Sequence, residues 1–582
     1  MVPICLKKYL QQNKTQDLSI MEQRLIECVP NFSEGNDMAI IKQITDQIES
    51  VDGVKLLDVD PGKATNRTVV TFVGTPEEVC EAAFRATKKA KELIDMSKHH
   101  GAHPRFGATD VLPLIPVANI TMEEVVAYAH KLAKRIGDEL DYPVYCYENA
   151  AFDEKRRNLA YCRSGEYEAL PEKLTKPEWK PDFGPAKFVA ETGAIAVGAR
   201  NFLIAVNFNL NTTSTRRANA VAFDVREKGR PVREGNPVTG KKKLDENGKE
   251  IWTPGTLKGT KAIGWFIDEY GVAQVSMNIT DINQTPLHVA FEEVKRKADA
   301  RGLRVTGTEI VGLVPASVIM DAGKYFLAKQ QRSAGIADEE IIKIAIKSMG
   351  LDELYPFEPN KKIVEEMIKD EKKHLIDLTV TGFAIETASE SPAPGGGSIA
   401  AYMGALGAAL GTMVANLSAH KPGWDDRWEE YSKVAEQGKS YMDQLLRMVD
   451  EDTNAFNKIM DALSLPKKTD EEKNARKKAI QDATRYATEV PYKTMLLCYD
   501  SMQVMLEMAK KGNPNSVSDA GVGALAARSG VYGAYLNVCI NAKGLEDQKF
   551  ASEILENANG LLTKTISLEQ EILRIVMEII NK

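Results

Sequence analysis

Residues 442–463, MDQLLRMVDEDTNAFNKIMDAL, carry the apolar period of an α-helix, with spacings of three and four residues. The period needs an apolar residue at position 452, and Asp452 stands there instead. Asp450 lies about 200° further round the helix and is expected to face elsewhere. Burial disfavours an ionised carboxylate, so the pattern predicts a raised pKa for Asp452 and makes it a candidate general acid. A buried aspartate that fixes the register of neighbouring helices explains the pattern equally well. The apolar positions are Met442, Leu445, Val449, Phe456, Ile459 and Leu463.

The rest of the C-terminal region shows the same helical period and almost no strand pattern. We expect a linker at residues 369–374 and an all-α helical bundle over residues 375–582. A glycine-rich turn with Gly396 and Ser398 precedes one helix; its backbone N–H groups can bind an anion, or the chain simply enters a tightly packed helix there. Asp519 follows a polar loop at the start of a later helix. The predicted helices are 399–417, 428–463, 470–508, 518–542 and 547–581.

The N-terminal region repeats one order of elements, β-α-β-β-α, twice. Two strands joined by a tight turn and flanked by helices predict a split β-α-β unit with a largely antiparallel sheet. We therefore predict a multidomain chain with two ferredoxin-like α+β sandwich lobes, residues 21–202 and 203–368, and a cleft between them. Residues 1–20 are expected to form a disordered leader, with Met21 as an alternative start. Residues 227–259, rich in Lys, Gly and Pro, are expected to be a surface excursion.

The composition excludes several classes of protein. The 582 residues hold 75 Lys and Arg against 82 Asp and Glu, a net charge of −7, which is too little positive charge for nucleic-acid binding. Seven cysteines lie apart without a C-x-x-C pair, so we expect reduced thiols in a cytoplasmic protein. No apolar run matches a membrane span, because the closest, residues 399–414, is too rich in Gly and Ala.

Three of the seven histidines lie within five residues, in the segment His99-His100-Gly-Ala-His103-Pro104-Arg105. Pro104 favours extended backbone at His103, so the imidazole is presented from a loop beside the guanidinium of Arg105. An imidazole that exchanges protons near neutral pH and an arginine that binds a carboxylate predict a general acid/base with an anion clamp. A solvated basic loop is the other interpretation. A metal site is not expected, because no Asp or Glu lies at ligand spacing.

Two further segments gather polar groups. Asp60, Asn66 and Arg67 lie in a turn between two strands, where they can bind a polar ligand or simply form the turn. A glycine-bounded segment between the two predicted lobes can line the cleft and stack on a flat ligand, or it can be a plain linker. This segment consists of Gly184, Pro185, Ala186, Lys187, Phe188, Val189, Ala190, Glu191, Thr192 and Gly193.

The motifs of both regions occur together and in one order. Residues from about Met21 to Pro359 resemble glutamate formimidoyltransferase, and the C-terminal region resembles formimidoyltetrahydrofolate cyclodeaminase. The N-terminal motifs are 27–35 (ECVPNFSEG), 57–60 (LDVD), 65–68 (TNRT), 103–105 (HPR), 165–171 (GEYEALP), 182–185 (DFGP) and 198–200 (GAR). The C-terminal motifs are 393–398 (APGGGS), the 449–456 helix (VDEDTNAF) and the 512–519 loop (GNPNSVSD).

The resemblance implies roles for individual residues. It makes His103 the catalytic residue of the transferase, Gly184–Gly193 the folate-contacting segment, and Asp452 the catalytic carboxyl of the cyclodeaminase. Two departures from the family pattern are residues 1–20 and the longer loop within 227–259. Supporting candidates are Arg105 and Arg67, which can hold substrate carboxylates, and Asn66, Asp60, Gly396, Ser398 and Asp519.

The resemblance also implies a bifunctional enzyme of histidine degradation. The first reaction moves the formimidoyl group from N-formimidoyl-L-glutamate to tetrahydrofolate, giving 5-formimidoyltetrahydrofolate and glutamate. The second cyclises this product to 5,10-methenyltetrahydrofolate and releases ammonia. Tetrahydrofolate, expected to be polyglutamylated, is a co-substrate, no metal is required, and a homo-oligomer is expected. The alternatives are a formyl-transferring enzyme fused to a methenyltetrahydrofolate cyclohydrolase-like domain, and a non-catalytic folate-binding scaffold.

Overall fold

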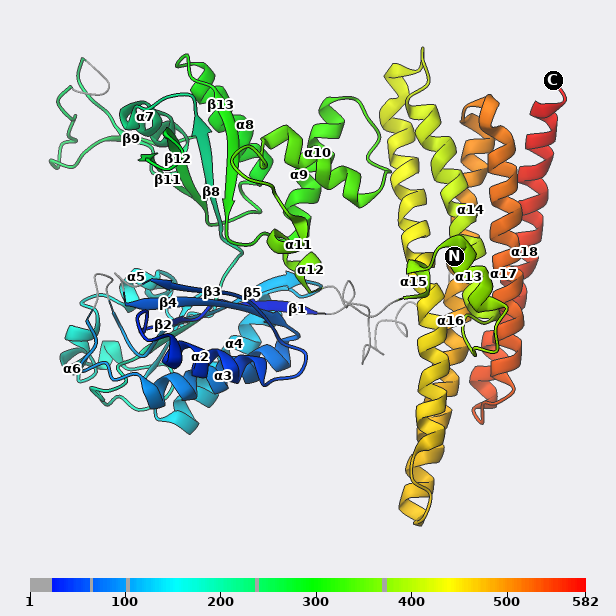
Figure 1. The fold of residues 1–582 in the computed structure, drawn as a ribbon, viewed down its shortest axis with the longest axis horizontal. Coiled ribbons are helices and arrows are strands. Elements are labelled where there is room, and N and C mark those ends of the chain that lie inside the picture. Colours follow the sequence, from blue (N-terminus) through cyan, green and yellow to red (C-terminus); the bar gives the residue numbers. More distant parts are fainter. Residues whose placement is uncertain (1–23, 63–65, 101–104, 236–239, 369–373) are drawn as a thin grey trace. The chain divides into compact units, whose positions relative to one another are not determined.

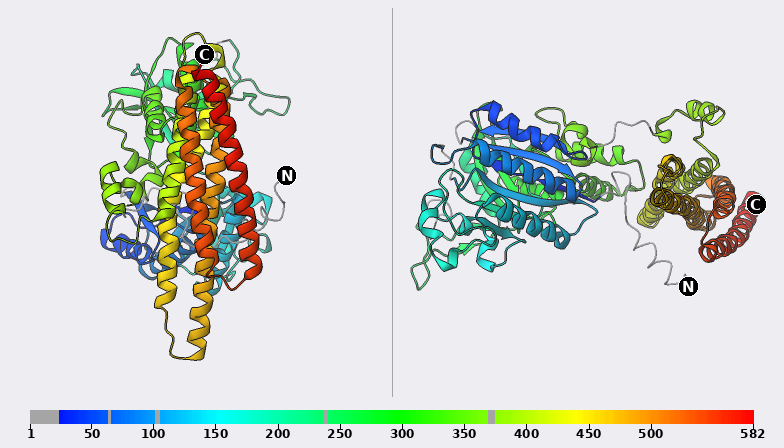
Figure 2. Two further views of the ribbon diagram at one scale, coloured as in Figure 1. Left: turned by 90° about the vertical axis from the view of Figure 1, so that its right-hand side faces the viewer. Right: turned by 90° about the horizontal axis from the view of Figure 1, so that it is seen from below.

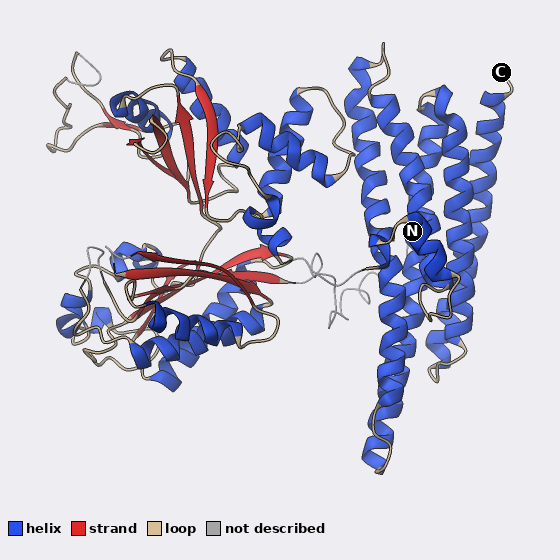
Figure 3. Cartoon of the chain, in the orientation of Figure 1, coloured by secondary structure: helices blue, strands red, loops and turns tan. Residues whose placement is uncertain are grey.

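The computed structural model describes residues 24–62, 66–100, 105–235, 240–368 and 374–582 (Figures 1 and 3). The chain divides into two compact units, residues 1–319 with 349–370 and residues 320–348 with 371–582. The predicted leader, His103 and residues 369–373 of the predicted linker lie outside the described residues. Residues 320–348, which the sequence-based division assigned to the second lobe, group with the helical region. The domain limits and the cleft between the lobes stay predictions.

The first lobe is built on one seven-stranded mixed sheet. Its strands are β1 (Leu25–Cys28), β2 (Asn31–Phe32), β3 (Lys55–Gly62), β4 (Arg67–Gly74), β5 (Thr109–Ala118), β6 (Val144–Glu148) and β7 (Ile195–Ala199). β1 and β2 follow one another between β4 and β5, β3 lies beyond β4, and β7 and then β6 lie beyond β5. The β5–β7 and β7–β6 pairs are parallel. The sheet is therefore less antiparallel than the sequence predicted, because α4 is a crossover between β5 and β6.

Helices cover one face of this sheet (Figure 1). They are α2 (Met38–Glu49), α3 (Pro76–Leu93) and α4 (Met122–Leu140), with the short helices α5 (Leu159–Cys162) and α6 (Leu170–Lys173) after β6. Their apolar stripes face the sheet, and Thr121 with Glu124 forms a capping box that starts α4. The large buried side chains of the core, such as Phe72, Leu112 and Tyr145, come mostly from the central strands.

The second lobe has a four-stranded antiparallel sheet in the order β11–β12–β8–β13. These strands are β8 (Ile204–Leu210), β11 (Thr260–Ile267), β12 (Val272–Ile279) and β13 (Val305–Val311), with helices α7 (Thr215–Val225) and α8 (Leu287–Asp299). The described residues of the predicted excursion hold the short pair β9 (Arg230–Pro231) and β10 (Trp252–Thr253) and two isolated β-bridges, and most of them are exposed. The helices that follow are α9 (Ala316–Lys329), α10 (Asp338–Met349), α11 (Pro359–Lys362) and α12 (Val364–Met367).

The C-terminal region is helical throughout its described residues, as predicted (Figure 2). It consists of α13 (Val380–Thr387), α14 (Gly396–Ala419), α15 (Trp428–Ser464), α16 (Asp470–Lys511), α17 (Val517–Ala542) and α18 (Gln548–Ile580). The last five match the five helices predicted from the apolar period to within three residues at each end. α14 packs against α15, α16 and α17 and is the central helix of the bundle.

α14 is the one helix in the described ranges with the length and hydropathy of a membrane span. In the structure 61% of its most apolar window is buried inside the bundle. Its buried positions are mainly Gly and Ala, which let neighbouring helices approach closely. This burial is typical of the core helix of a bundle.

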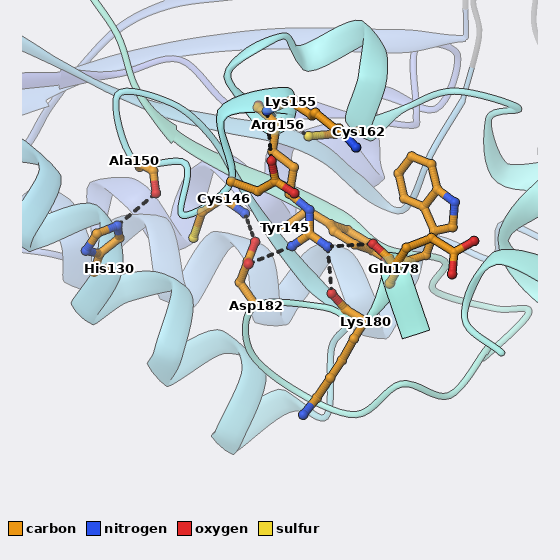
Figure 4. Close-up of polar contacts among 12 residues, drawn as sticks. His130, Tyr145, Cys146, Ala150, Lys155, Arg156, Cys162, Glu178, Lys180 and Asp182 are labelled. Atoms are coloured by element: carbon orange, nitrogen blue, oxygen red, sulfur yellow. Dashed lines mark hydrogen bonds and ion pairs between the residues drawn. The ribbon is translucent and has the colours of Figure 1, made fainter. Parts of the chain in front are cut away.

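A buried ion pair fixes the chain that leads toward Gly184 (Figure 4). Arg156 donates to Asp182 at 2.6 Å, and both side chains are less than a tenth exposed. Asp182 also accepts from the backbone N–H of Cys146 in β6, and Arg156 donates to the carbonyl of Lys180. Breaking such a pair on one side leaves a buried charge without its partner, at a cost of about 3–5 kcal/mol. The aspartate of the 182–185 motif therefore has a structural role at the edge of the sheet.

Candidate functional site

The best-defined candidate site in the helical unit is the start of α14. The Asp452 carboxylate, from α15, accepts hydrogen bonds from the backbone N–H of Ser398 at 2.9 Å and from its hydroxyl at 3.1 Å. The Ser398 hydroxyl also lies 2.9 Å from the carbonyl of Val449, and Ser398 is fully buried. A side chain at Gly397 would overlap the Asp452 carboxyl. The structure therefore brings together Asp452, Ser398 and the glycine-rich turn that the sequence singled out separately.

Two effects act on the proton of Asp452. Burial raises the pKa of its carboxyl above the ordinary aspartate value, and the hydrogen bonds from Ser398 oppose this shift. The N-terminus of a helix also favours a negative charge, which acts in the same direction as Ser398. The net effect raises the pKa, so the carboxyl can hold a proton and release it to a group beside the helix start.

The structure confirms only part of the apolar stripe that the sequence predicted around Asp452. Leu445 and Val449 are buried, but Phe456 and Leu463 are 40% and 43% exposed. Beyond Asp452 the buried positions of α15 are Ala455 and Ala462. The apolar stripe continues along α15 beyond the end of the helices that pack tightly against it. The apolar period therefore predicts more burial there than the structure has.

Asp450 faces a different partner, as predicted from its position on the helix, but it is not solvated. Its carboxylate accepts from the backbone N–H of Leu375 at 2.7 Å and lies 4.0 Å from the ring of His374. Burial raises the pKa of Asp450, while the Leu375 hydrogen bond and His374 lower it. Asp450 thus fastens the beginning of the described helical region to α15.

Asn537 of α17 is a neighbour of this site that the sequence did not reveal. A Cβ added at Gly396 would lie 3.5 Å from Nδ2 and 3.9 Å from Oδ1 of Asn537. The contact joins residues about 140 positions apart, and a single asparagine on a helix carries no sequence signal.

Asp519 does not join this site within the chain. It lies in the first turn of α17, next to the loop in which Asn513 donates its backbone N–H to Ser418 Oγ. Ser418 is at the C-terminal end of α14, about 30 Å along the helix from Ser398. The two candidates therefore occupy opposite ends of α14.

In the first lobe, polar candidates meet beside the β3–β4 hairpin. Arg67 donates to Asp110 at 2.6 Å and to Asn31 at 2.9 Å, and burial lowers the pKa of its guanidinium while Asp110 opposes the shift. Asn66 accepts from the backbone N–H of Gly35 and donates to the carbonyl of His100. The structure thus joins the 27–35 and 65–68 motifs to the segment that leads to residue 103.

Asp60 lies apart from this cluster. It is exposed and belongs to β3, where it pairs with Val69 in register, so the turn begins later than the sequence predicted.

Arg105 anchors the other end of the histidine segment. Its guanidinium donates to Glu168 at 2.9 Å, to the carbonyl of Met96 at 2.9 Å and to the carbonyl of His99. The Tyr167 ring lies 4.4 Å from it. In this structure the Arg105 guanidinium is thus bonded to protein groups. The catalytic assignment of His103 stays a prediction.

The segment Gly184–Gly193 belongs to the first lobe. The sequence also allowed it to be an interlobe linker, and the structure does not support that interpretation. Gly193 pairs with Gly107, the carbonyl of Glu191 accepts from the N–H of Met96, and the Phe188 ring lies 5.5 Å from that of Tyr167. The C-terminal end of the segment therefore lies beside Met96 and Gly107, whereas Gly184 packs against Tyr142 and Gly137. Lys187 and Ala186 are exposed, and Thr192 is buried.

The sequence did not single out two buried acidic residues near these motifs, Asp110 and Glu27. Asp110 is 1% exposed and accepts from both Arg67 and Arg163. Glu27, 3% exposed in β1, has its pKa raised to about 7 by burial, with Arg200 lowering and Glu365 raising it. A charged residue inside the apolar strand 25–29 is the signal that could have revealed Glu27. Within the described ranges, no group of three His, Cys, Asp or Glu is arranged to hold a metal ion.

Comparisons with known proteins assign the whole chain to known families. The formiminotransferase domain, N-terminal subdomain, matches residues 25–200, the formiminotransferase domain matches 205–369, and the formiminotransferase-cyclodeaminase model matches 379–560. Formimidoyltransferase-cyclodeaminase of Gallus gallus is 43% identical over 93% of this chain and 96% of the relative.

Two shorter relatives match one part of the chain each. Glutamate formimidoyltransferase of Streptococcus pyogenes is 39% identical over 52% of this chain and 93% of the relative. Methenyltetrahydrofolate cyclohydrolase of Methylorubrum extorquens is 41% identical over 35% of this chain and 98% of the relative. With all three domain models in order and a relative matched over nearly its full length, the chain belongs to the formimidoyltransferase-cyclodeaminase family.

Proposed function

We propose that the chain is a bifunctional folate enzyme, a glutamate formimidoyltransferase joined to a formimidoyltetrahydrofolate cyclodeaminase. The N-terminal part transfers the formimidoyl group from N-formimidoyl-L-glutamate to N5 of tetrahydrofolate. The C-terminal part converts the product to 5,10-methenyltetrahydrofolate and ammonia. The observation that carries the proposal is the half-buried Asp452 carboxyl at the glycine-rich start of α14, in a chain that contains the domains of both family members.

In the transferase, His103 is the proposed acid/base. N5 loses a proton as it attacks the amidine carbon, and the departing glutamate nitrogen gains one, so one imidazole can serve both steps. Gly184–Gly193 is the proposed folate-binding segment, and its contacts with Met96 and Gly107 support a position beside the histidine loop. Arg105 and Arg67 are already bound to protein groups, so we assign them the positioning of this loop and hairpin.

In the cyclodeaminase, Asp452 is the proposed general acid. N10 attacks the formimidoyl carbon and loses its proton, and the formimidoyl nitrogen leaves as ammonia with the electron pair of the broken C–N bond. One further proton must reach this nitrogen, because an amide ion is a poor leaving group. A carboxyl whose pKa is raised by burial can supply that proton, and the Ser398 N–H receives the resulting anion.

A second candidate function for the C-terminal part is hydrolysis of the methenyl group. The relative from Methylorubrum extorquens, named methenyltetrahydrofolate cyclohydrolase, matches this part at 41% identity. Such an enzyme would take formyl rather than formimidoyl groups through the coupled reaction and would release no ammonia. Ammonia release from N-formimidoyl-L-glutamate and tetrahydrofolate separates the two functions.

We also infer the fold type of the two lobes, the limits of the domains and the cellular location of the protein. Both lobes are ferredoxin-like, a proposal supported by the order β11–β12–β8–β13 and by the equivalent order β3–β4–β1–β5 at one side of the first sheet. The proposed domains are 21–202, 203–368 and 375–582. The net charge and the separate cysteines favour a cytoplasmic protein.

The first prediction concerns the transferase. His103→Ala should lower formimidoyl transfer by about 10²–10⁴-fold, because the acid/base is lost. Ammonia release from supplied 5-formimidoyltetrahydrofolate should stay unchanged. Both activities are followed by glutamate and ammonia assays, with His130→Ala, a histidine that binds the carbonyl of Ala150, as the control. Equal loss of both activities in His103→Ala would show that the assignment is wrong.

The second prediction concerns the cyclodeaminase. Asp452→Asn should let 5-formimidoyltetrahydrofolate accumulate, since the amide cannot supply a proton. In the unmodified enzyme the cyclodeaminase rate should fall as pH rises through the raised pKa of Asp452, because only the protonated carboxyl donates. Absorbance of the methenyl product against pH measures both effects. Asp461→Asn, an exposed residue of the same helix, is the control. Normal methenyl formation by Asp452→Asn would remove Asp452 from this role.

We further propose that the folate substrate is polyglutamylated. A cavity of about 430 Å³ lies between the α15–α16 turn and the α17–α18 turn and is lined by Lys467, Lys473, Arg476 and Lys477 with one acid, Glu546. Positive charge of this kind suits a row of carboxylates. Lys467→Glu with Lys473→Glu should raise the cyclodeaminase KM for a pentaglutamate substrate about tenfold and leave the monoglutamate KM unchanged. Lys564→Glu, elsewhere on α18, is the control, and an equal effect on both substrates would contradict the proposal.

We also propose that the enzyme is a homo-oligomer formed through the face of α14 and α17. This face exposes apolar side chains on two adjacent helices, which water-soluble surfaces usually avoid. Leu536→Glu with Ile540→Glu should lower the sedimentation coefficient to that of the monomer. Val380→Glu, also exposed but on α13, should not. Unchanged sedimentation of the double variant would rule out this interface. The exposed residues are Leu406, Met413, Leu417, Val522, Leu525, Tyr532, Leu536 and Ile540.

A further inference from the structure

The carboxamide of Asn537 faces the start of α14. Asn537 is half-buried on α17, and an added Cβ at Gly396 would lie 3.5 Å from its Nδ2. The next residue, Gly397, faces the carboxyl of Asp452 in the same way. Two consecutive glycines at the start of α14 therefore face a carboxamide from α17 and a carboxyl from α15, so both groups lie at the same helix start.

The hydrogen-bonding capacity of Asn537 is mostly unused. Nδ2 donates to the carbonyl of Gly533 at 2.9 Å, within its own helix. Among the described residues no donor is bonded to Oδ1, and a second hydrogen remains on Nδ2. A half-buried carboxamide with a free acceptor, at the helix start that also meets the Asp452 carboxyl, is suited to a ligand that carries an N–H group.

Gly396 and Gly397 differ in how much space surrounds the position that a side chain would occupy. A side chain at Gly397 would overlap Asp452, so this glycine is required by the protein's own packing. A methyl group at Gly396 would make only ordinary van der Waals contact with Asn537. Packing alone thus tolerates alanine at position 396, and the space in front of Asn537 is not needed by the fold.

We propose that Asn537 is a substrate-binding residue of the cyclodeaminase and that its Oδ1 accepts a hydrogen bond from the formimidoyl nitrogen. This inference rests on the proposed function. The contact holds the nitrogen near Asp452. As N10 forms its bond to the formimidoyl carbon, the proton that N10 loses and one proton from Asp452 both reach this nitrogen. The C–N bond then breaks, the pair stays on nitrogen, and ammonia leaves the methenyl cation.

The test compares Asn537→Ala with Ser529→Ala in the full-length enzyme. Ser529 donates to the carbonyl four residues earlier on the same helix, as Asn537 does, and is also half-buried, but it lies eight residues before Asn537, so it is a matched control for the lost intrahelical bond. Asn537→Ala should lower kcat/KM for 5-formimidoyltetrahydrofolate about 10–100-fold, the usual cost of losing a hydrogen bond to a charged group. The transferase activity should stay unchanged in both variants. Equal cyclodeaminase kinetics in the two variants would overturn the inference.

A negative charge at position 537 should change the pH dependence of the cyclodeaminase rate. A purely structural role of Asn537 predicts no such change. Asn537→Asp places a second carboxylate near Asp452, which should raise the pKa of Asp452. The fall of the cyclodeaminase rate should then occur at higher pH, and Ser529→Asp should not shift it. An unshifted profile in Asn537→Asp would contradict the placement of Asn537 at the acid.

Gly396→Ala tests the space itself. It should lower kcat/KM while the melting temperature stays at or above that of the unmodified enzyme, because the methyl group fits and alanine favours helix. Unimpaired turnover with alanine at 396 would show that no substrate occupies this space. Absence of ammonia release by the unmodified enzyme would instead refute the proposed function, so the two failures are distinguishable.

Discussion

The helical unit depends on the close approach of α14 to its neighbours, which only very small residues permit. A Cβ at Gly407 would lie 2.7 Å from the carbonyl oxygen of Gly523, and one at Gly530 would lie 2.7 Å from that of Ala400. At Gly404 it would overlap the sulfur of Cys498. These contacts recur along several turns, so α14 cannot slide or rotate against α16 and α17 without steric overlap. The position of its first turn, where Ser398 meets Asp452, is a consequence of this packing.

The chemistry of Asp452 follows from two opposed environments at that first turn. Full burial can raise a carboxyl pKa by up to 3–5 units, whereas a helix N-terminus stabilises the anion by about 0.3–1 kcal/mol. Burial is the larger effect here, and the pKa is raised. The Ser398 N–H still lowers the cost of ionisation at the moment the proton leaves. The two environments thus oppose one another at this carboxyl, and burial raises its pKa.

The sequence predicted the helices of the C-terminal unit because an apolar period survives over many turns, but it could not show where that period stops being buried. The α15–α16 hairpin extends beyond the other helices (Figures 1 and 2), and there Phe456 and Leu463 are exposed. Contacts between residues far apart in the sequence could not be predicted for a different reason. Arg105 looked like an anion clamp, yet it binds Glu168, and Asn537 meets Gly396 across about 140 residues, with no local pattern to announce either contact.

One turn of α15 links the entry into the helical unit to its chemistry. Asp450 accepts the N–H of Leu375 at the start of this region, and two residues later Asp452 accepts the N–H of Ser398. Burial raises the pKa of both carboxyls, but Asp450 is bonded to the backbone of a connecting segment and Asp452 to the start of α14. A fragment that begins after Leu375 would lose this hydrogen bond and open Asp450 to water, which would weaken the attachment of the connecting segment to α15.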